Sequence, residues 1–220
     1  MSIEIYWGSG STFAWRVLLA LEVKQLPYAS RLLEFSKKEH KTPAFLQMNP
    51  RGKVPTLKDG DFVVYESIAI LQYLDRKYPQ IPLFGTTAEE SGAINQDVCE
   101  MLSYMEEPVS RITRPLFIGE LTGKEQRVRE AAEVVHQEFS RYDARLAHFP
   151  WLRGEHISAS DIVLYPFLPT LLRAAAKPAA EKLNMAYMPL SRHYPHLTRW
   201  MTAVEALPGY ARTYPPHWRQ

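Results

Sequence analysis

Hydrophobic and polar positions in the first 84 residues switch between the periods of strands and helices. Ile3–Trp7 is short, β-branched and aromatic, which predicts a strand, and apolar positions recur at helical spacing from Phe13 to Pro27. In chain order the pattern then predicts a strand, a short helix, two hairpin strands and a helix at residues 28–35, 43–48, 54–57, 62–65 and 67–78. The order β-α-β followed by β-β-α is typical of a small mixed sheet with helices on its faces.

Every periodic segment after residue 88 is helical. Bends are expected at Pro108 and Pro115, where the ring removes a helical hydrogen bond. Ser158–Asp161 resembles a capping box at the start of an apolar run. The other helical patterns cover residues 89–116, 128–146 and 193–206. We therefore predict an α/β domain over residues 1–80, a linker over 81–88 and an all-α domain over 89–220.

Composition excludes several classes of function. The 26 basic and 24 acidic residues give a net charge of +2, which is too balanced for an electrostatic nucleic-acid binder. The single cysteine, Cys99, excludes a disulfide scaffold, a CxxC redox pair and a thiolate zinc site. The seven histidines form no HExxH-type pair, so no metal is expected. The longest apolar run, residues 162–172, is too short to span a membrane, and without an export signal we expect a cytoplasmic protein.

Ser11 and Thr12 lie just before the first turn of a predicted helix. Hydroxyls are favoured there as N-caps, because they accept an orphan backbone N–H. They can also stabilise a bound anion at the helix N-terminus, and a thiolate is such an anion. The sequence leaves both interpretations open. Gly8 and Gly10 also resemble the start of a dinucleotide fingerprint, but Phe13 occupies the position of its third glycine.

Three further segments combine a structural and a functional interpretation. Val54–Pro55 is a strand-entry proline, or a cis bond that leaves the backbone open to a ligand. Glu66–Ser67 caps a helix, or holds an ammonium and a carboxylate group. His40–Lys41 is a solvated pair, or a carboxylate clamp. Together with Ser11 they are expected at one end of the sheet, where a ligand with a thiol, an extended peptide backbone and charged ends would meet each of them.

These segments, at their mutual spacing, resemble the glutathione S-transferases over essentially the whole chain. The resemblance lies in residues 11–17 (STFAWRV), 49–55 (NPRGKVP), 66–70 (ESIAI) and 158–161 (SASD). It implies a thioredoxin-like N-terminal domain fused to an all-helical domain. Two departures stand out: Thr12-Phe13 replaces the Ser-Cys pair of the zeta-like motif, and Ser160 replaces the usual Ala before the Asp of the capping box.

The resemblance implies that Ser11 donates a hydrogen bond to the glutathione sulfur, as in the serine-type phi, zeta and theta classes. Thr12 is the alternative contact for the sulfur. Tyr6, whose position matches the tyrosine-type activator, is a further alternative, with strand packing as its structural role.

The rest of the glutathione site is implied in the same way. His40 and Lys41 match positions that hold the glycyl carboxylate, and Lys53 lies near the same end. Val54–Pro55 is expected to be cis and to pair its backbone with the cysteinyl unit. Glu66–Ser67 would hold the γ-glutamyl group.

The acceptor would be bound where the helical domain faces Ser11. The candidates are Tyr104, Met105, Pro108, Arg111 and Ile112. Core packing is the alternative for each of them. Arg111 and Arg114 are less easily buried, and they could attract an anionic acceptor or leaving group.

We thus expect a homodimeric transferase that uses glutathione as co-substrate and attacks a small hydrophobic electrophile with its thiolate. Reductive dehalogenation, peroxide reduction and double-bond isomerisation by the same thiolate are alternatives. A non-catalytic binding or assembly module is an alternative of another class. The presence of Ser11, Glu66 and Ser67 together argues against that module, because a scaffold need not keep all three.

Overall fold

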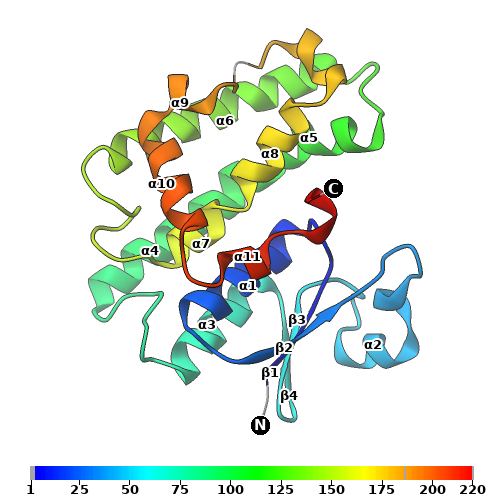
Figure 1. Ribbon diagram of the computed structural model, residues 1–220, viewed down its shortest axis with the longest axis vertical. Coiled ribbons are helices and arrows are strands. Elements are labelled where there is room, and N and C mark those ends of the chain that lie inside the picture. The colour runs from blue at the N-terminus through cyan, green and yellow to red at the C-terminus, as the bar shows by residue number, and fades with distance from the viewer. Residues whose placement is uncertain (1–2, 186, 220) are drawn as a thin grey trace. The chain divides into compact units, whose positions relative to one another are not determined.

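The computed structural model describes residues 3–185 and 187–219 (Figure 1). The described chain forms two compact units, one of residues 3–84 with 206–219 and one of residues 85–205. Within the described residues, no helix combines the length and the apolar character needed to cross a membrane.

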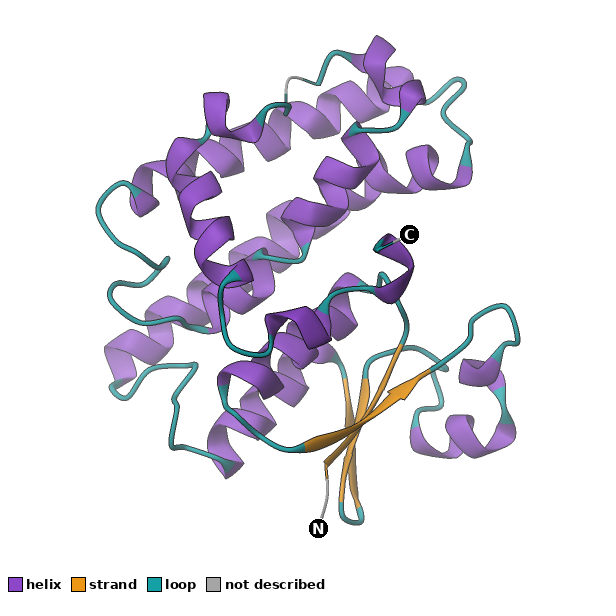
Figure 2. Ribbon diagram, viewed as in Figure 1, coloured by secondary structure: helices purple, strands orange, loops and turns teal. Residues whose placement is uncertain are grey.

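The first unit is built on a four-stranded mixed sheet in the order β2-β1-β3-β4 (Figure 2). Its strands are β1 (Ile3–Trp7), β2 (Tyr28–Leu32), β3 (Thr56–Asp59) and β4 (Phe62–Tyr65). β2 runs parallel to β1, and the other neighbours are antiparallel, which confirms the predicted topology. β3 begins two residues later than predicted, because Pro55 has no N–H to donate to the ladder.

Helices cover both faces of this sheet (Figure 2). α1 (Thr12–Val23) and α3 (Ser67–Lys77) lie on one face, and α2 (Pro43–Met48) lies on the other, next to η1 (Glu39–Lys41). The two C-terminal helices of this unit, α11 (Tyr210–Thr213) and η4 (Pro216–Trp218), pack on α1. Ile5 and Leu57 of the sheet pack with Val17 of α1 and Ile70 of α3 in one apolar core. On the opposite face, the ring of Tyr6 meets the ring of Phe45 in α2, with 6.0 Å between centroids. The amphipathic pattern of α3 fixes the face on which it packs, whereas α1 is buried all around from Ala14 to Glu22.

The last 14 described residues depart from the expected domain boundary, because they join the first unit. Trp15 of α1 donates from Nε1 to Thr213 Oγ1 at 2.9 Å, and Arg212 forms an ion pair with Glu22. The ring of Trp15 also packs edge-on against Trp218, with 5.4 Å between centroids. No signal in the sequence indicated the partner of residues 206–219, and in the structure that partner is the buried indole of Trp15.

The second unit is all-helical, as predicted. Its elements are α4 (Ala88–Glu100), η2 (Met101–Met105), α5 (Glu106–Ile118), α6 (Glu125–Leu146), α7 (Ala159–Leu164), α8 (Phe167–Ala175), η3 (Pro178–Leu183), α9 (Leu190–His193) and α10 (Pro195–Glu205). The interruption in the first long helix lies at the π-helical turn η2, and α5 continues through Pro115. Pro108 has no N–H for the carbonyl of residue 104, so the ladder shifts in the turn before it.

The predicted capping box is present at the start of α7. The backbone N and Oγ of Ser158 both donate to Asp161 Oδ2 at 2.9 Å. The other oxygen of Asp161 accepts from Leu152 N at 2.9 Å and from Trp200 Nε1 at 2.8 Å. Asp161 is fully buried, and this burial raises the pKa of its carboxyl group against the opposing effect of the four donors.

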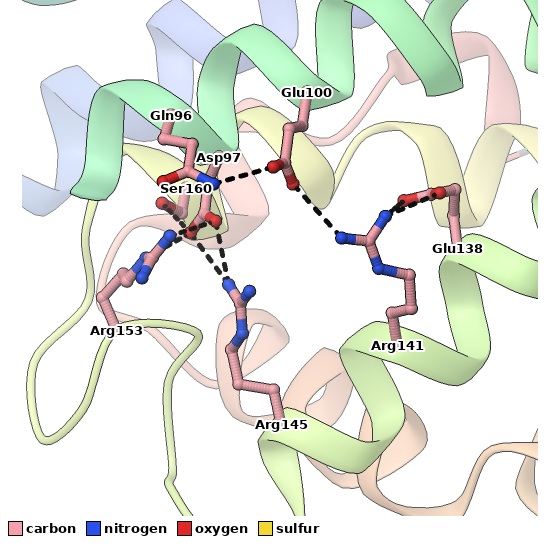
Figure 3. A network of polar contacts seen from close by, with 8 residues as sticks. All are labelled: Gln96, Asp97, Glu100, Glu138, Arg141, Arg145, Arg153 and Ser160. Atoms are coloured by element: carbon pink, nitrogen blue, oxygen red, sulfur yellow. Dashed lines mark hydrogen bonds and ion pairs between the residues drawn. The ribbon is translucent and has the colours of Figure 1, made fainter. Parts of the chain in front are cut away.

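A second buried carboxylate explains the serine within the box. Ser160 Oγ donates to Asp97 Oδ2 at 2.9 Å, where the resemblance leads one to expect an alanine (Figure 3). Arg145 and Arg153 donate to the same carboxylate at 2.9 Å and 2.6 Å. The hydroxyl therefore joins α7 to α4 through Asp97.

Candidate functional site

The register of the sheet brings the predicted site segments to one end. Trp7 pairs with Leu32, Tyr6 with Thr56, and Thr56 with Tyr65. The segments that follow β1, β2 and β4 and the segment that precedes β3 therefore all leave the sheet at the same edge. These segments carry Ser11, Thr12, His40, Lys41, Lys53, Val54, Pro55, Glu66 and Ser67. The convergence expected from the sequence is present in the structure.

Ser11 is the N-cap of α1, and its Oγ accepts from Ala14 N at 3.3 Å. Its own N–H donates to Gly8 O at 3.1 Å, which closes the turn between β1 and α1. Capping uses a lone pair of the hydroxyl oxygen, so the hydroxyl hydrogen can still be donated to a ligand. The structural and the functional interpretation of Ser11 are therefore compatible. Thr12, the first residue of α1, is half-buried beside it.

Tyr6 lies in a different environment. Its hydroxyl lies 3.5 Å from Glu4 Oε2, and the same carboxylate accepts from Arg31 Nε at 2.9 Å. Burial, and then the negative charge of Glu4, raise the pKa of Tyr6. The phenol is thus held protonated beside an acidic side chain on the sheet face that also meets α2.

The loop that leads into β3 is held by Asn49, which is only 2% exposed. Its Nδ2 donates to Lys53 O at 2.9 Å and to Thr56 Oγ1 at 3.0 Å, and its Oδ1 accepts from Arg51 N at 3.1 Å. The Val54–Pro55 bond that follows is cis, as predicted. Sequence reasoning used Asn49 only as part of a motif and missed that its amide holds both ends of this loop.

Lys41 supports the same loop from outside. Its Nζ donates to Gly52 O at 2.8 Å and to Arg51 O at 3.3 Å. Gly52 has a φ of +56°, and a Cβ placed on it would lie 2.9 Å from the backbone oxygen of His40, so only glycine fits. The Nδ1 atom of His40 is buried, and it has no hydrogen-bond partner within the described part of the chain. Lys41 is exposed and holds the loop at the same time, and Lys53 is exposed as well, so both interpretations of His40–Lys41 stay open.

Glu66 and Ser67 differ in exposure. The side chain of Glu66 is 68% exposed and its Oε1 lies 4.0 Å from Arg51 Nε. Ser67 is buried at the first position of α3 and accepts from Arg16 Nη1 at 3.4 Å. No side chain caps α3 within the described residues, so the prediction that Ser67 is a cap is wrong. Its hydroxyl instead pairs with a second helix.

Arg16 lies beside the candidate site, and sequence reasoning gave it no role there. Its side chain is fully buried in α1, and its guanidinium lies 5.0 Å from the ring centroid of Phe13. The signal was present, because Arg16 is a charged residue inside an apolar run. Arg16 places a positive charge next to Ser67, where it favours binding of a carboxylate.

In the helical unit, some of the residues predicted to bind the acceptor are buried and others are exposed. Met105, Pro108 and Ile112 are buried, in agreement with core packing. Tyr104 is 56% exposed, and Arg111 is exposed and paired with Glu107 of the same helix. Arg111 also lines a cleft of about 550 Å³ between α5 and α6. The cleft's other charged residues are Glu107, Arg114, Lys124, Arg127 and Glu130.

The chain matches two models of known protein families. Residues 10–77 match the N-terminal domain of glutathione S-transferases, and residues 101–208 match the C-terminal domain. A probable glutathione S-transferase from Oryza sativa subsp. japonica, GSTF2, is 32% identical over 209 residues, which are 91% of each chain.

Solved structures agree with these matches. A glutathione S-transferase from the Antarctic clam Laternula elliptica superposes with a TM-score of 0.82 at 29% identity, over 100% of this chain and 95% of its own. Glutathione S-transferase-I bound to lactoylglutathione superposes with a TM-score of 0.79 at 26% identity, over 97% and 98%. Together with the geometry of the sheet edge, these matches establish that the chain belongs to the glutathione S-transferase family.

Proposed function

We propose that the first unit binds glutathione at the end of the sheet and that Ser11 stabilises its thiolate for attack on a hydrophobic electrophile. The observation that carries this proposal is the sheet register, which gathers Ser11, Val54–Pro55 and Glu66–Ser67 at one edge. In the reaction, the sulfur forms a bond to an electrophilic carbon. The leaving group departs with the electron pair of the broken bond, and the thiol proton goes to solvent.

The energetic demand on Ser11 is moderate. Lowering a thiol pKa by ~2 units needs about 2.7 kcal/mol of preferential thiolate stabilisation. A hydrogen bond to a charged group contributes ~1.5–3 kcal/mol, and a helix N-terminus adds ~0.3–1 kcal/mol. Ser11 is the N-cap of the 12-residue helix α1, so a sulfur bound beside it would receive both the hydrogen bond and the effect of the helix N-terminus.

The remaining residues fit the charged ends of the peptide. Glu66 offers an exposed carboxylate to the γ-glutamyl ammonium group. Ser67, beside Arg16 at the start of α3, suits the γ-glutamyl carboxylate. The half-buried imidazole of His40 suits the glycyl carboxylate, and Lys41 holds the loop that presents Val54.

We expect glutathione to raise the melting temperature, because a ligand of the native state stabilises it by mass action. Turnover with a panel of aryl halides, epoxides, isothiocyanates and hydroperoxides then tests the chemistry. Release of halide with formation of a thioether supports conjugation, whereas oxidised glutathione formed from hydroperoxides supports the peroxidase alternative. A folded sample whose melting temperature does not respond to millimolar glutathione would refute the proposal.

The change Glu66→Gln should weaken glutathione binding about tenfold, because it removes the charge that faces the ammonium group while keeping the shape of the side chain. Isothermal titration calorimetry measures the affinity. Asp61→Asn is the matched control: it removes one exposed carboxylate in the turn between β3 and β4, at the opposite end of the sheet. Equal affinities of the two variants would show that Glu66 does not contact the ligand.

We further propose that the protein is a homodimer that acts in the cytoplasm. Membership of the family and the frequency of C₂ dimers support the dimer, and the reduced state of cytosolic glutathione supports the compartment. Sedimentation at micromolar concentration should give twice the 25.4 kDa of the chain. A monomer at that concentration would contradict the dimer.

A further inference from the structure

The C-terminal segment of the first unit lies against the turn that precedes α1 (Figure 1). The imidazole Nδ1 of His217 lies 2.5 Å from Ser9 Oγ, and the two residues are 208 positions apart in the sequence. A Cβ placed on Gly10 would lie 2.9 Å from His217 Cε1. The ring therefore packs directly on the two residues that come before Ser11.

The segment that carries His217 is fixed on α1. Trp15 is the anchor, since its Nε1 bonds Thr213 and its ring meets those of Tyr214 and Trp218, at centroid distances of 5.8 Å and 5.4 Å. The last described residue, Arg219, donates to the carbonyl of Ala211 and so folds the segment back on itself. These contacts hold the imidazole in place over the turn.

The turn itself determines where Ser11 points. Ser11 N donates to Gly8 O at 3.1 Å, so Ser9 and Gly10 are its two central residues. Gly10 has a φ of +80° and no side chain, which leaves Ser9 as the only central residue whose side chain can fix the turn. The hydrogen bond between Ser9 and His217 therefore restrains the backbone conformation of the turn that ends at Ser11.

We propose that His217 is a positioning residue for thiolate formation: through Ser9 it holds the turn of residues 8–11 in the conformation that aims the Ser11 hydroxyl at the sulfur. This inference rests on the role proposed above for Ser11. It assigns a catalytic consequence to the C-terminal segment, which the sequence placed in the helical domain. A purely structural His217 would affect the stability of the fold without affecting the thiol.

The test compares Ser9→Ala, His217→Ala, the double variant and His217→Asn in the full chain. Ultraviolet titration gives the pKa of the bound glutathione thiol, steady-state kinetics gives kcat and KM, and circular dichroism gives the melting temperature. Each alanine variant should raise the thiol pKa by about half to one unit and lower kcat about three- to tenfold at neutral pH, with KM for glutathione nearly unchanged.

Two comparisons separate positioning from general damage. The double variant should be no worse than either single variant, because both remove the same bond. His217→Asn should restore most of the thiolate, since its amide can occupy the place of Nδ1. His156→Ala, which removes an exposed histidine of the second unit, is the matched control and should change nothing.

Ser11→Ala, measured in parallel, distinguishes the two levels of the proposal. If Ser11→Ala raises the thiol pKa while Ser9→Ala and His217→Ala leave it unchanged, the inference about His217 is overturned and the proposed function stands. Additive effects in the double variant would also overturn it. If Ser11→Ala leaves the pKa unchanged, the role proposed for Ser11 fails first.

Discussion

Replacing Ser11 with alanine should raise the pKa of bound glutathione by about one to two units and reduce turnover at neutral pH about ten- to a hundredfold. The hydroxyl stabilises the thiolate and not the thiol, so its loss shifts the equilibrium toward the protonated form. The peptide ends remain held by Glu66, Ser67 and His40, so glutathione affinity should change much less. Because the thiol pKa rises, the rate profile should move to higher pH, and turnover should recover in alkaline buffer.

Two controls isolate the thiolate effect. Ser11→Ala also removes an N-cap, worth about 1 kcal/mol of stability. Thr87→Ala removes a comparable cap, since Thr87 Oγ1 accepts from Glu90 N at 3.1 Å at the start of α4. It should lower stability without moving the thiol titration. Thr12→Val removes the neighbouring hydroxyl and keeps the shape of the side chain.

The outcome assigns the sulfur contact. A titration that moves only in Thr12→Val would give the role to Thr12. If neither variant moves it, Tyr6→Phe becomes the decisive change and the serine-type mechanism is wrong. The structure argues against that result, because the Tyr6 hydroxyl lies beside the Glu4 carboxylate and has a raised pKa.

Much of the fold could be predicted because its signals are local. The strand Ile3–Trp7, the helix at residues 43–48 and the strand Phe62–Tyr65 were predicted with the bounds that the structure shows. Hydrophobic period and turn residues act within a few positions, so a single sequence displays them. The common edge of the site followed from topology alone, since a β-α-β unit and a hairpin fix which strand ends lie together.

What could not be predicted depends on partners distant in the sequence. Arg16 meets Ser67 across 51 positions, and His217 meets Ser9 across 208. No period or spacing rule connects such residues. The capping interpretation of Ser67 was wrong for a local reason: Glu66 occupies the N-cap position of α3, and Ser67 is already the first helical residue.

The second large effect is expected at Asp161, where the change to alanine should lower the free energy of unfolding by about 3 kcal/mol or more. The carboxylate accepts from two backbone N–H groups, the Ser158 hydroxyl and the Trp200 indole, all in a fully buried position. Removing it leaves the two N–H groups and the indole without an acceptor, and each buried unsatisfied donor costs ~1–3 kcal/mol. For a chain of this length, that corresponds to a fall of roughly 6–12 °C in melting temperature.

Asp143→Ala provides the matched comparison for Asp161, because it removes a carboxylate of the same unit that accepts one backbone bond, from Leu197 N at 2.8 Å. Asp143 is half-buried, so water can replace part of what is lost, and a cost of about 1 kcal/mol is expected. Urea denaturation followed by circular dichroism measures both variants. If the two variants lose equal stability, the four donors around Asp161 do not act as a unit, and the capping box of α7 contributes no more than an ordinary helix cap.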